Sequence, residues 1–395
     1  MKPAAQNSSE IAVAGGGPAG LIAALAIAQT GAELTLIAPK PLSDPRTTAL
    51  LGTSVDILQN IGVWGAIAGK TAPLRKLRLV DGTRRLIRTP EVLFDSAELD
   101  LEAFGYNIEN ENLLSALRNA LGTHPNVRVI EAAVEKVELR DENAILTLGS
   151  GETISVKLVV AADGRHSICR HAAGIRTSKR PLAQSAVALN LSHTRPHREI
   201  SVEFHTEGGP FTLVPLPGMR SSLVWVCPPE DAERIRAASD EVLSREIEQK
   251  SHSILGEIRA QQPRGIFPLG VELAESFAAR RVVLVGESGH VLPPIGAQGL
   301  NLGIRDAAEI AQLIGNARTA GEDCGGDLLL KTYDTARGGD VRSRALAVEM
   351  LGRSLLTGFL PVHLARGLGL ELAARVPILR KGLMRTGLGR SVNAG

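Results

Sequence analysis

An apolar stretch near the start of the chain is interrupted by glycine. Residues 11–32 contain no charged residue, but four glycines and a proline lie in the first half of this stretch. Glu10 precedes it where a signal peptide would carry a basic cluster, and the glycines break the run that a membrane span requires. The pattern therefore predicts a buried strand at Ile11–Ala14, a turn, and a buried helix from Pro18 to about Gln29.

The chain between residues 184 and 230 alternates apolar and polar residues with a period of two. Glycine and proline divide it into "QSAVALNLSH", "REISVEFHTEG", "GPFTLVPLPG" and "SSLVWVCPPE". This alternation predicts an antiparallel sheet with one buried face. The earlier segment "LRKLRLVDGTRRLIRT", which begins at Leu74, is predicted to add strands to the same sheet.

Two further apolar strands each lead into a turn. "KLVVAADG" ends in Asp163 and Gly164, and Ser167 is placed to cap the short helix that follows. "RRVVLVGES" leads into a Gly-Glu turn, a proline-rich loop and a helix that begins near Gly299. From about Arg342 onward the pattern is helical. These elements predict an α/β fold with an inserted antiparallel sheet and a helical C-terminal region.

Length and composition restrict the class of protein. At 395 residues the chain is long for one hydrophobic core, so we expect two domains and an extension. The chain is 44% apolar and 22% charged with a formal net charge of +2, which indicates neither disorder nor polyanion binding. Aromatic residues make up only 3% and offer few stacking platforms, so we predict no nucleic-acid binding.

The three cysteines, Cys169, Cys227 and Cys324, are far apart and lack the spacing of a metal-binding motif. We interpret them as small buried or surface thiols and predict no metal site. A reducing compartment fits this usage, so the chain is expected to be cytoplasmic.

The turn after the first strand carries Gly-x-Gly-x-x-Gly on Gly15, Gly17 and Gly20. In a dinucleotide-binding unit the first glycine permits a tight turn and the second lets a pyrophosphate approach the backbone. The third allows the helix to pack closely on the strand. Pro18 suits the first helical position, and the turn that begins with Pro18 and Ala19 presents N–H groups to an anion. The flanking strand and helix make the motif specific.

The second predicted strand departs from that pattern. "LTLIAPK" spans Leu34 to Lys40 and places Ala38 where such a unit usually carries an Asp or Glu that binds a ribose hydroxyl. Three explanations are open on this pattern alone: the glycine turn is incidental, other parts of the chain hold the nucleotide, or a site has been lost. Lys40 either binds the 2′-phosphate of NADP or is a solvated loop residue.

Several segments together carry a resemblance to one enzyme family. They are the glycine turn, "RTTALLGTSVDILQNIGVW", "NIENENLLSAL", the Asp-Gly pair and "GESGHVLPPIGAQGLN". In this combination the chain resembles the group A flavin-dependent aromatic hydroxylases, which are related in fold to para-hydroxybenzoate hydroxylase. Within that group it is most similar to the ubiquinone-biosynthesis hydroxylases, and the similarity covers nearly the whole length.

The resemblance implies FAD as the cofactor and a Rossmann-like FAD-binding domain of the glutathione-reductase type. The antiparallel sheet would then be an inserted substrate domain, with substrate between the sheet and the flavin. The expected FAD-binding domain consists of residues 8–75, 100–178 and 275–341. The expected substrate domain consists of residues 76–99 and 179–274, and the C-terminal helical region of residues 342–395.

The resemblance also implies roles for individual residues. Arg46 matches an arginine near the adenine half of FAD, where its charge suits a phosphate, or it is a solvated loop residue. Glu287 stands where the family has Asp beside the ribityl chain, and Asn110 where relatives often carry Arg or Gln. The expected cofactor-binding residues are Gly15, Gly17, Pro18, Ala19, Gly20, Arg46, Asn110, Asp163, Gly164, Glu287, Pro294, Gly299, Leu300 and Asn301.

The loop before the last of these residues supplies the candidate catalytic residues, His290 and Pro293. A loop histidine that holds its neighbours is the favoured interpretation of His290. The wall of the substrate site is a separate prediction, with ordinary core packing as the alternative for each residue. Its candidates are Phe211, Leu213, Val214, Pro215 and Leu216.

The resemblance implies a monooxygenase that transfers one oxygen atom of O2 to an electron-rich ring through a flavin C4a-hydroperoxide. The expected substrate is a polyprenylated phenol of ubiquinone biosynthesis, and the electron donor, NAD(P)H or another, stays open. The residues at Ala38, Asn110 and Glu287 keep two alternatives in view. One is a flavin-free family member that acts as a scaffold or lipid carrier in quinone biosynthesis, and the other is an NADP-dependent reductase.

The C-terminal region is basic and rich in leucine. After Leu351 its only acid is Glu371, and its basic residues are Arg353, Arg366, Arg375, Arg380, Lys381, Arg385 and Arg390. Either these helices pack on the body with the arginines in water, or they form a peripheral surface on anionic lipid at the inner face of the membrane. A protein complex of quinone biosynthesis is a further expected partner.

Overall fold

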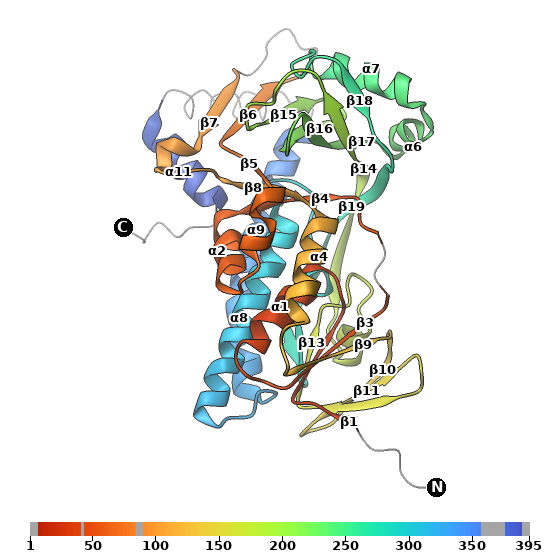
Figure 1. Ribbon diagram of the computed structural model, residues 1–395, viewed down its shortest axis with the longest axis vertical. Helices are drawn as coiled ribbons and strands as arrows, with labels where there is room; N and C mark the ends of the chain where they lie inside the picture. The colour runs from red at the N-terminus through yellow and green to blue at the C-terminus, as the bar shows by residue number, and fades with distance from the viewer. Residues whose placement is uncertain (1–6, 41–42, 84–89, 357–375, 389–395) are drawn as a thin grey trace.

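The computed structural model describes residues 7–40, 43–83, 90–356 and 376–388. Figure 1 shows an elongated molecule with a parallel sheet and long helices toward one end and a larger sheet at the other. A small sheet and short helices lie between the two. The fold therefore separates a part built on the parallel sheet from a part built on the larger sheet, as the sequence predicts.

A six-stranded sheet in the order β20-β21-β13-β2-β3-β9 forms the first layer. Its strands are β2 (Ile11–Ala14), β3 (Leu34–Ala38), β9 (Val127–Glu131), β13 (Leu158–Ala161), β20 (Ala278–Ala279) and β21 (Val282–Leu284). All pairings are parallel except that of β20 with β21. The predicted strand, turn and helix over residues 11–32 are confirmed, because the glycines connect β2 to α1 (Pro18–Ala28).

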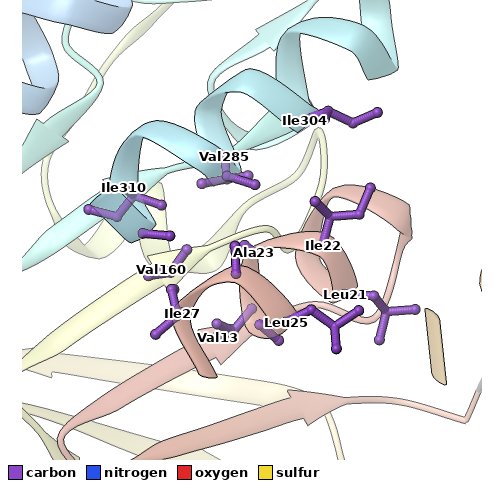
Figure 2. Packing of buried hydrophobic residues seen from close by; sticks show 14 of the residues in the cluster. Val13, Leu21, Ile22, Ala23, Leu25, Ile27, Val160, Val285, Ile304 and Ile310 are labelled. Atoms are coloured by element: carbon purple, nitrogen blue, oxygen red, sulfur yellow. The ribbon is translucent and has the colours of Figure 1, made fainter. Parts of the chain in front are cut away.

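Helix α1 is buried from Gly20 to its end, which accounts for its lack of charge. It packs against α8 (Gln298–Ala320) and α4 (Asn110–Leu121) as well as the sheet. Figure 2 shows Ile22 and Ile27 of α1 gathered with Ile304 and Ile310 of α8 in one apolar cluster. The helix that carries the glycine turn is thus fixed on both sides.

The opposite face of this sheet is covered by a four-stranded sheet and a short helix. The elements are β1 (Asn7–Ser8), β10 (Val134–Leu139), β11 (Ala144–Leu148), β12 (Thr153–Val156) and α5 (Ile168–Ala172). Ile37 and Val159 pack there against Leu146. Ser167 accepts a hydrogen bond from the Arg170 N–H and caps α5, as predicted.

Nine strands form the largest sheet, in the order β22-β19-β14-β17-β16-β15-β6-β7, with β18 paired to β14. They are β6 (Lys76–Asp81), β7 (Val92–Asp95), β14 (Thr177–His193), β15 (Ile200–Thr206), β16 (Gly209–Leu216), β17 (Arg220–Cys227), β18 (Ile258–Ala260), β19 (Gly265–Ala274) and β22 (His290–Val291). The inserted sheet is confirmed with one difference, since β15 and β6 pair in parallel. These two strands are far apart in the chain, so no hairpin sets their direction.

Two helices that were not among the predicted elements cover the outer face of this sheet, α6 (Pro229–Ala237) and α7 (Asp240–Lys250). Phe211 and Leu213 of the proposed substrate wall pack in the core beneath them. The core-packing alternative is therefore the correct one for these two residues. Leu213 also lines a cavity of about 390 Å³ on this outer face, which includes none of the expected cofactor-binding residues.

A small sheet joins the two larger ones (Figure 1). This part contains β4 (Thr47–Leu51), β5 (Ala72–Pro73), β8 (Gly105–Glu109), α2 (Gly52–Asn60), α3 (Trp64–Ile67), η1 (Ala68–Lys70) and η2 (Ser96–Leu99). Asn107 of β8 donates from Nδ2 to the Pro215 carbonyl at 2.9 Å and to Ser222 Oγ at 3.2 Å. Arg220 Nη2 forms an ion pair with Glu109 Oε1 at 2.7 Å. These contacts fix the nine-stranded sheet on the small sheet that joins it to the parallel sheet.

The C-terminal region contains α9 (Asp327–Leu356) and α11 (Pro377–Leu388). Helix α9 is continuous across residue 342, where the C-terminal region was expected to begin. Met384 packs beneath β6 and β7, and Arg380 pairs with Glu98 at 2.8 Å. No helix in the described part of the chain is long and apolar enough to cross a bilayer. The predicted lipid surface also includes side chains outside the described residues, those of Arg353, Arg366, Glu371, Arg375 and Arg390.

Candidate active site

The glycine turn between β2 and α1 combines close packing with an open side. Gly15 has φ 119°, and a Cβ on it would lie 2.1 Å from the Ala162 carbonyl oxygen. A Cβ on Gly20 would lie 2.1 Å from the Gly15 carbonyl oxygen, so both positions require glycine. A Cβ on Gly17 would meet no atom of the described chain within 4 Å, and the backbone there has an ordinary φ of −72°. The space beside Gly17 is not needed by the fold and suits a ligand.

The first turn of α1 lies against the second turn of α8. Helix α1 begins at Pro18 and α8 at Gln298, and neither is capped by a side chain of the described residues. A Cβ on Gly303 would lie 3.2 Å from Ala19 Cβ, and Gly299 faces open space. Uncapped helix N-termini present N–H donors and a positive dipole end. This arrangement suits the binding of anionic groups.

Asp163 and Gly164 follow β13 at the carboxyl edge of the same sheet. Asp163 Oδ2 accepts a hydrogen bond from the Cys169 N–H at 3.1 Å. Its Oδ1 is buried and has no hydrogen-bond partner within the described residues. Gly164 has φ 81° and open space beside it. A buried carboxylate oxygen without a donor is costly, so this atom would accept a hydrogen bond from a ligand or a water bound at this edge.

Arg46, in the loop before β4, binds Asp44 through hydrogen bonds of 2.7 Å from both Nε and Nη2. Asn110 donates to Asp44 Oδ2 at 2.8 Å and accepts from Thr48 Oγ1 at 2.6 Å. Burial raises the pKa of Asp44, but the hydrogen bonds from Arg46 and Asn110 outweigh burial and lower the pKa below 3.8. The sequence prediction missed Asp44, although it stands two residues before Arg46.

Glu287 lies in η3 (Gly286–Ser288) with an exposed side chain. The hydrogen bond to Asp44 raises the pKa of Arg46, burial lowers it, and the charges of Asp44 and Glu287 raise it further. Arg46 and Glu287 therefore lie close enough to interact. The Arg46 guanidinium also lies 5.3 Å from the ring centre of Phe267 on β19. Arg46 thus stands where the two large parts of the molecule meet.

His290 is buried away from this open region. Its Nε2 lies 2.7 Å from Asp306 Oδ2, and Arg337 Nε donates to Asp306 Oδ1 at 2.6 Å. Burial raises the pKa of Asp306, but the charge and hydrogen bond of His290, the charge of Arg337 and the Gly286 N–H together lower it. The ionised carboxylate can only accept, so Nε2 is the donor. The geometry favours a holding role, and a catalytic role for His290 stays a prediction.

The same network reaches the first residue of α8. Arg337 Nη1 lies 3.0 Å from Asp340 Oδ2, and Arg344 Nε donates to Asp340 Oδ1 at 2.9 Å. Arg344 Nη1 then donates to Gln298 Oε1 at 3.1 Å. Helix α9 therefore holds the start of α8 through a chain of charged side chains. None of these partners was predicted, because no local sequence pattern links α9 to α8.

The remaining predicted residues lie along the loop into α8. Asn301 donates to the Ala49 carbonyl at 2.8 Å and accepts from the Leu51 N–H at 2.9 Å, which fixes α8 on β4. Pro293 is buried in the loop, and its catalytic role stays a prediction. Pro294 is exposed and Leu300 half-buried.

Comparison with known proteins shows the family to which this chain belongs. A protein-family model described as "FAD binding domain" matches residues 8–345. The chain is 32% identical to the ubiquinone hydroxylase UbiL of Rhodospirillum rubrum over 393 residues, covering 98% of this chain and 90% of the relative. It is 32% identical to the 3-demethoxyubiquinol 3-hydroxylase of Escherichia coli K12 over 391 residues, covering 96% and 98%. The chain belongs to the FAD-binding monooxygenases of the para-hydroxybenzoate hydroxylase type.

This monooxygenase is an FAD-dependent hydroxylase of the ubiquinone-biosynthesis family. Its fold is shared with p-nitrophenol 4-monooxygenase PnpA from Pseudomonas putida DLL-E4, with a TM-score of 0.81 at 18% identity, covering 98% of this chain and 99% of that one. The family, the fold class and the cofactor predicted from the sequence are confirmed.

The residues of this FAD-binding monooxygenase fit its cofactor in three respects. Gly17 leaves room beside an uncapped helix N-terminus, as a pyrophosphate requires. Asp163 offers a buried acceptor that lacks a donor in the described chain. Gly299 leaves room at a second uncapped helix start. In one respect the fit is poorer, because Ala38 at the end of β3 offers no polar group to the ribose.

Proposed function

We propose that this monooxygenase hydroxylates the aromatic ring of a polyprenylated phenol in ubiquinone biosynthesis. The observation that carries the proposal is the likeness, along nearly the whole chain, to two relatives whose names specify hydroxylation of ubiquinone or its precursor. Bound FAD supplies the oxygen-transfer chemistry. The chain would bind the cofactor, orient the ring and keep water away from the reacting atoms.

The start of α8 would present its N–H groups to the flavin ring, where the positive helix end favours negative charge. Arg46 would bind a phosphate of FAD, and Glu287 a hydroxyl of its ribityl chain. The contact network around Asp306 supports this role of α8. Asp306 holds Gly286 and His290 before the loop that leads into the helix, and Arg337, Asp340 and Arg344 extend the network to Gln298 at the end of the loop. Second-sphere contacts of this kind hold binding groups in place.

The substrate ring would lie between the flavin and the inner face of the substrate sheet. Ser222 belongs to this face, since Asn107 of β8 donates to its hydroxyl. Val214 is the register partner of Ser222 and lies on the same face. Leu216, two residues further along β16, has the same parity but is buried, whereas Val214 is half-buried. The placement of these two proposed wall residues supports a substrate contact.

A peripheral membrane contact is part of the proposal and is supported by α11. Ile378 is 83% exposed, Leu379 49% and Leu383 55%, and Lys381 and Arg385 lie on the same helix. Apolar side chains with basic neighbours suit an anionic lipid surface. The double variant Ile378→Asp with Leu383→Asp should lose flotation with anionic liposomes. The control is Leu328→Asp, at an apolar residue on α9 that is 66% exposed, and unchanged flotation of the double variant would contradict the contact.

The function is tested by a spectrum and an isotope assay. Protein titrated with FAD and passed through gel filtration should retain flavin absorption bands. It should then incorporate one atom of ¹⁸O-labelled O2 into a short-chain prenylated phenol, with NADH, NADPH or a photoreduced electron carrier supplied in parallel. Retained flavin without label in the phenol would contradict the substrate proposal. A protein that stays colourless would favour the scaffold or lipid-carrier alternative.

A further inference from the structure

The place of Ala38 raises the question of which group binds the adenosine ribose of FAD. Strand β3 ends at Ala38, whose side chain makes no hydrogen bond. A Cβ on Gly16 would lie 2.7 Å from Ala38 Cβ, so residue 38 stands directly beside the glycine turn. An acid at this position reaches the ribose of a dinucleotide in the usual unit, and a methyl group does not.

The neighbouring strand, β9, carries an acidic residue, Glu131, at the position paired with Ala38. Strand β9 pairs with β3 in parallel, and the register places Glu131 opposite Ala38, each the last residue of its strand. Ala38 and Val127 belong to the core that contains α1, whereas Ile37 and Ile130 belong to the core of the opposite face. Side chains alternate along a strand. Glu131 therefore lies on the same face as Ala38 and the glycine turn.

Glu131 is exposed, and the described residues provide it with neither an ion pair nor a side-chain hydrogen bond. Adjacent strands lie about 4.8 Å apart, so its long side chain starts one strand away from the position of the missing acid. Ligands of an open parallel sheet bind beyond the carboxyl ends of its strands, which is the edge that Glu131 occupies. Its carboxylate is thus available to a bound dinucleotide.

We propose that Glu131 replaces the acid missing at Ala38 and accepts a hydrogen bond from the ribose 2′-hydroxyl of the FAD adenosine. The carboxylate acts from β9, and the small side chain of Ala38 leaves the path from β9 to the glycine turn open. The inference uses the FAD binding of the family. It does not depend on which phenol is hydroxylated, so failure of the substrate proposal leaves it unaffected.

The test measures the FAD dissociation constant by quenching of flavin fluorescence. Glu131→Gln should weaken FAD binding about 10-fold to 100-fold, the loss of one hydrogen bond to a charged group. Ala38→Glu placed in an E131A background should restore most of the affinity, because it returns the acid to its usual strand. The matched control is Glu33→Gln, an exposed residue just before the opposite end of β3, which should bind FAD as the unaltered protein does.

An FAD analogue that lacks the adenosine 2′-hydroxyl separates a direct contact from other effects. The unaltered protein and E131Q should bind this analogue with equal affinity, since the group that Glu131 contacts is missing. Unchanged or tighter binding of FAD by E131Q would overturn the proposal, and tighter binding would mean that Glu131 only repels the phosphates. An equal loss for FAD and the analogue, or failure of A38E to restore E131A, would overturn it as well.

Discussion

The imidazole of His290 and the carboxylate of Asp306 are hydrogen-bonded at 2.7 Å in a site where both side chains are at most 1% exposed. The bond joins the strand after η3 to the middle of α8. Arg337 brings α9 to the same carboxylate at 2.6 Å. Three separate segments, β22, α8 and α9, therefore depend on one ionised group.

Removal of that group should be strongly destabilising. Asp306→Ala leaves a buried guanidinium and a buried imidazole without their acceptor, which costs about 3–5 kcal/mol in comparable buried pairs. The measurement is the free energy of unfolding from urea titration. Asp327→Ala serves as the control, because its partner Lys331 is exposed and such pairs contribute little. A loss below about 1 kcal/mol for D306A would contradict this account of the network.

The pH dependence of this contribution follows from the lowered pKa of Asp306. A carboxyl group whose pKa in the folded state lies below its unfolded value of 3.8 stabilises the fold above that value. The stabilisation is lost as the pH falls from 3.8 through the folded pKa. The stability difference between the unaltered protein and Asp306→Asn should accordingly shrink as the pH falls below about 4.

His290→Gln should distinguish a structural role of His290, as the partner of Asp306, from a catalytic role. A general acid or base contributes about 10²-fold to 10⁴-fold in rate, and its loss removes a limb of the pH–rate profile. Because His290 is buried on Asp306, we expect H290Q to lower the unfolding midpoint while the shape of the kcat profile against pH stays the same. A flattened profile in a protein of normal stability would instead assign His290 to the chemistry.

Gly15 and Gly17 of the turn should differ in what their substitution changes. Gly17→Ala should leave the thermal midpoint unchanged but weaken FAD binding by at least about tenfold, because the methyl group enters space that the cofactor uses. Gly15→Ala should lower stability itself, since it meets the Ala162 carbonyl and φ is 119°. Paired calorimetry and FAD titration distinguish the two. Equal effects of both substitutions on stability would contradict the open space at Gly17.

Arg46 and Asp44 should have opposite effects on FAD affinity. Arg46→Ala removes a bidentate donor and should weaken binding about 10-fold to 100-fold. Asp44→Asn removes the carboxylate that now binds the guanidinium, so it should tighten FAD binding. Fluorescence titration at low and high salt checks both. A weaker affinity in D44N would mean that Asp44 positions Arg46 for the cofactor instead of competing for it.

The cysteines should be unreactive in the folded protein. All three are buried and free, and burial, with lesser effects of nearby acids, raises the pKa of Cys227 and of Cys324 to about 11. Burial raises the pKa of Cys169 well above its usual value. At pH 8 about one thiol in a thousand is then ionised, so a disulfide reagent should react with none of them until urea unfolds the chain. Rapid labelling of any cysteine in the native protein would contradict this burial.

The glycine turn could be predicted because its reasons are local. Gly15, Gly17 and Gly20 lie within one strand, turn and helix, and the apolar character of that helix follows from its burial on several sides. The Ser167 cap is local in the same way. Helices α6 and α7 were missed, although α7 has a local sequence signal: Ser239 caps it, and Leu243 and Ile247 follow at helical spacing. The alternating strand pattern of the neighbouring segments drew the prediction toward a sheet.

Other features have no local signal. The parallel pairing of β15 with β6 depends on strands from distant parts of the chain. The carboxylate of Asp306 is shared by His290 and Arg337 only because α8 and α9 pack side by side. The register of Ala38 and Glu131 likewise appears only when β3 and β9 are paired. Contacts between distant segments are set by packing, which residue patterns along one segment do not encode.

The order of strands in the two large sheets has a consequence for synthesis on the ribosome. In the parallel sheet β13 pairs with β21, which ends only at Leu284. In the nine-stranded sheet the two edge strands are β7 and β22, which are far apart in the chain. At about 5–20 residues per second, β3 emerges roughly 10–50 s before β21 does. The apolar surfaces of β2, β3 and α1 must be shielded from other chains during that interval. Overproduction that outpaces chaperones should therefore yield aggregates of nascent chains, even when the finished enzyme is stable.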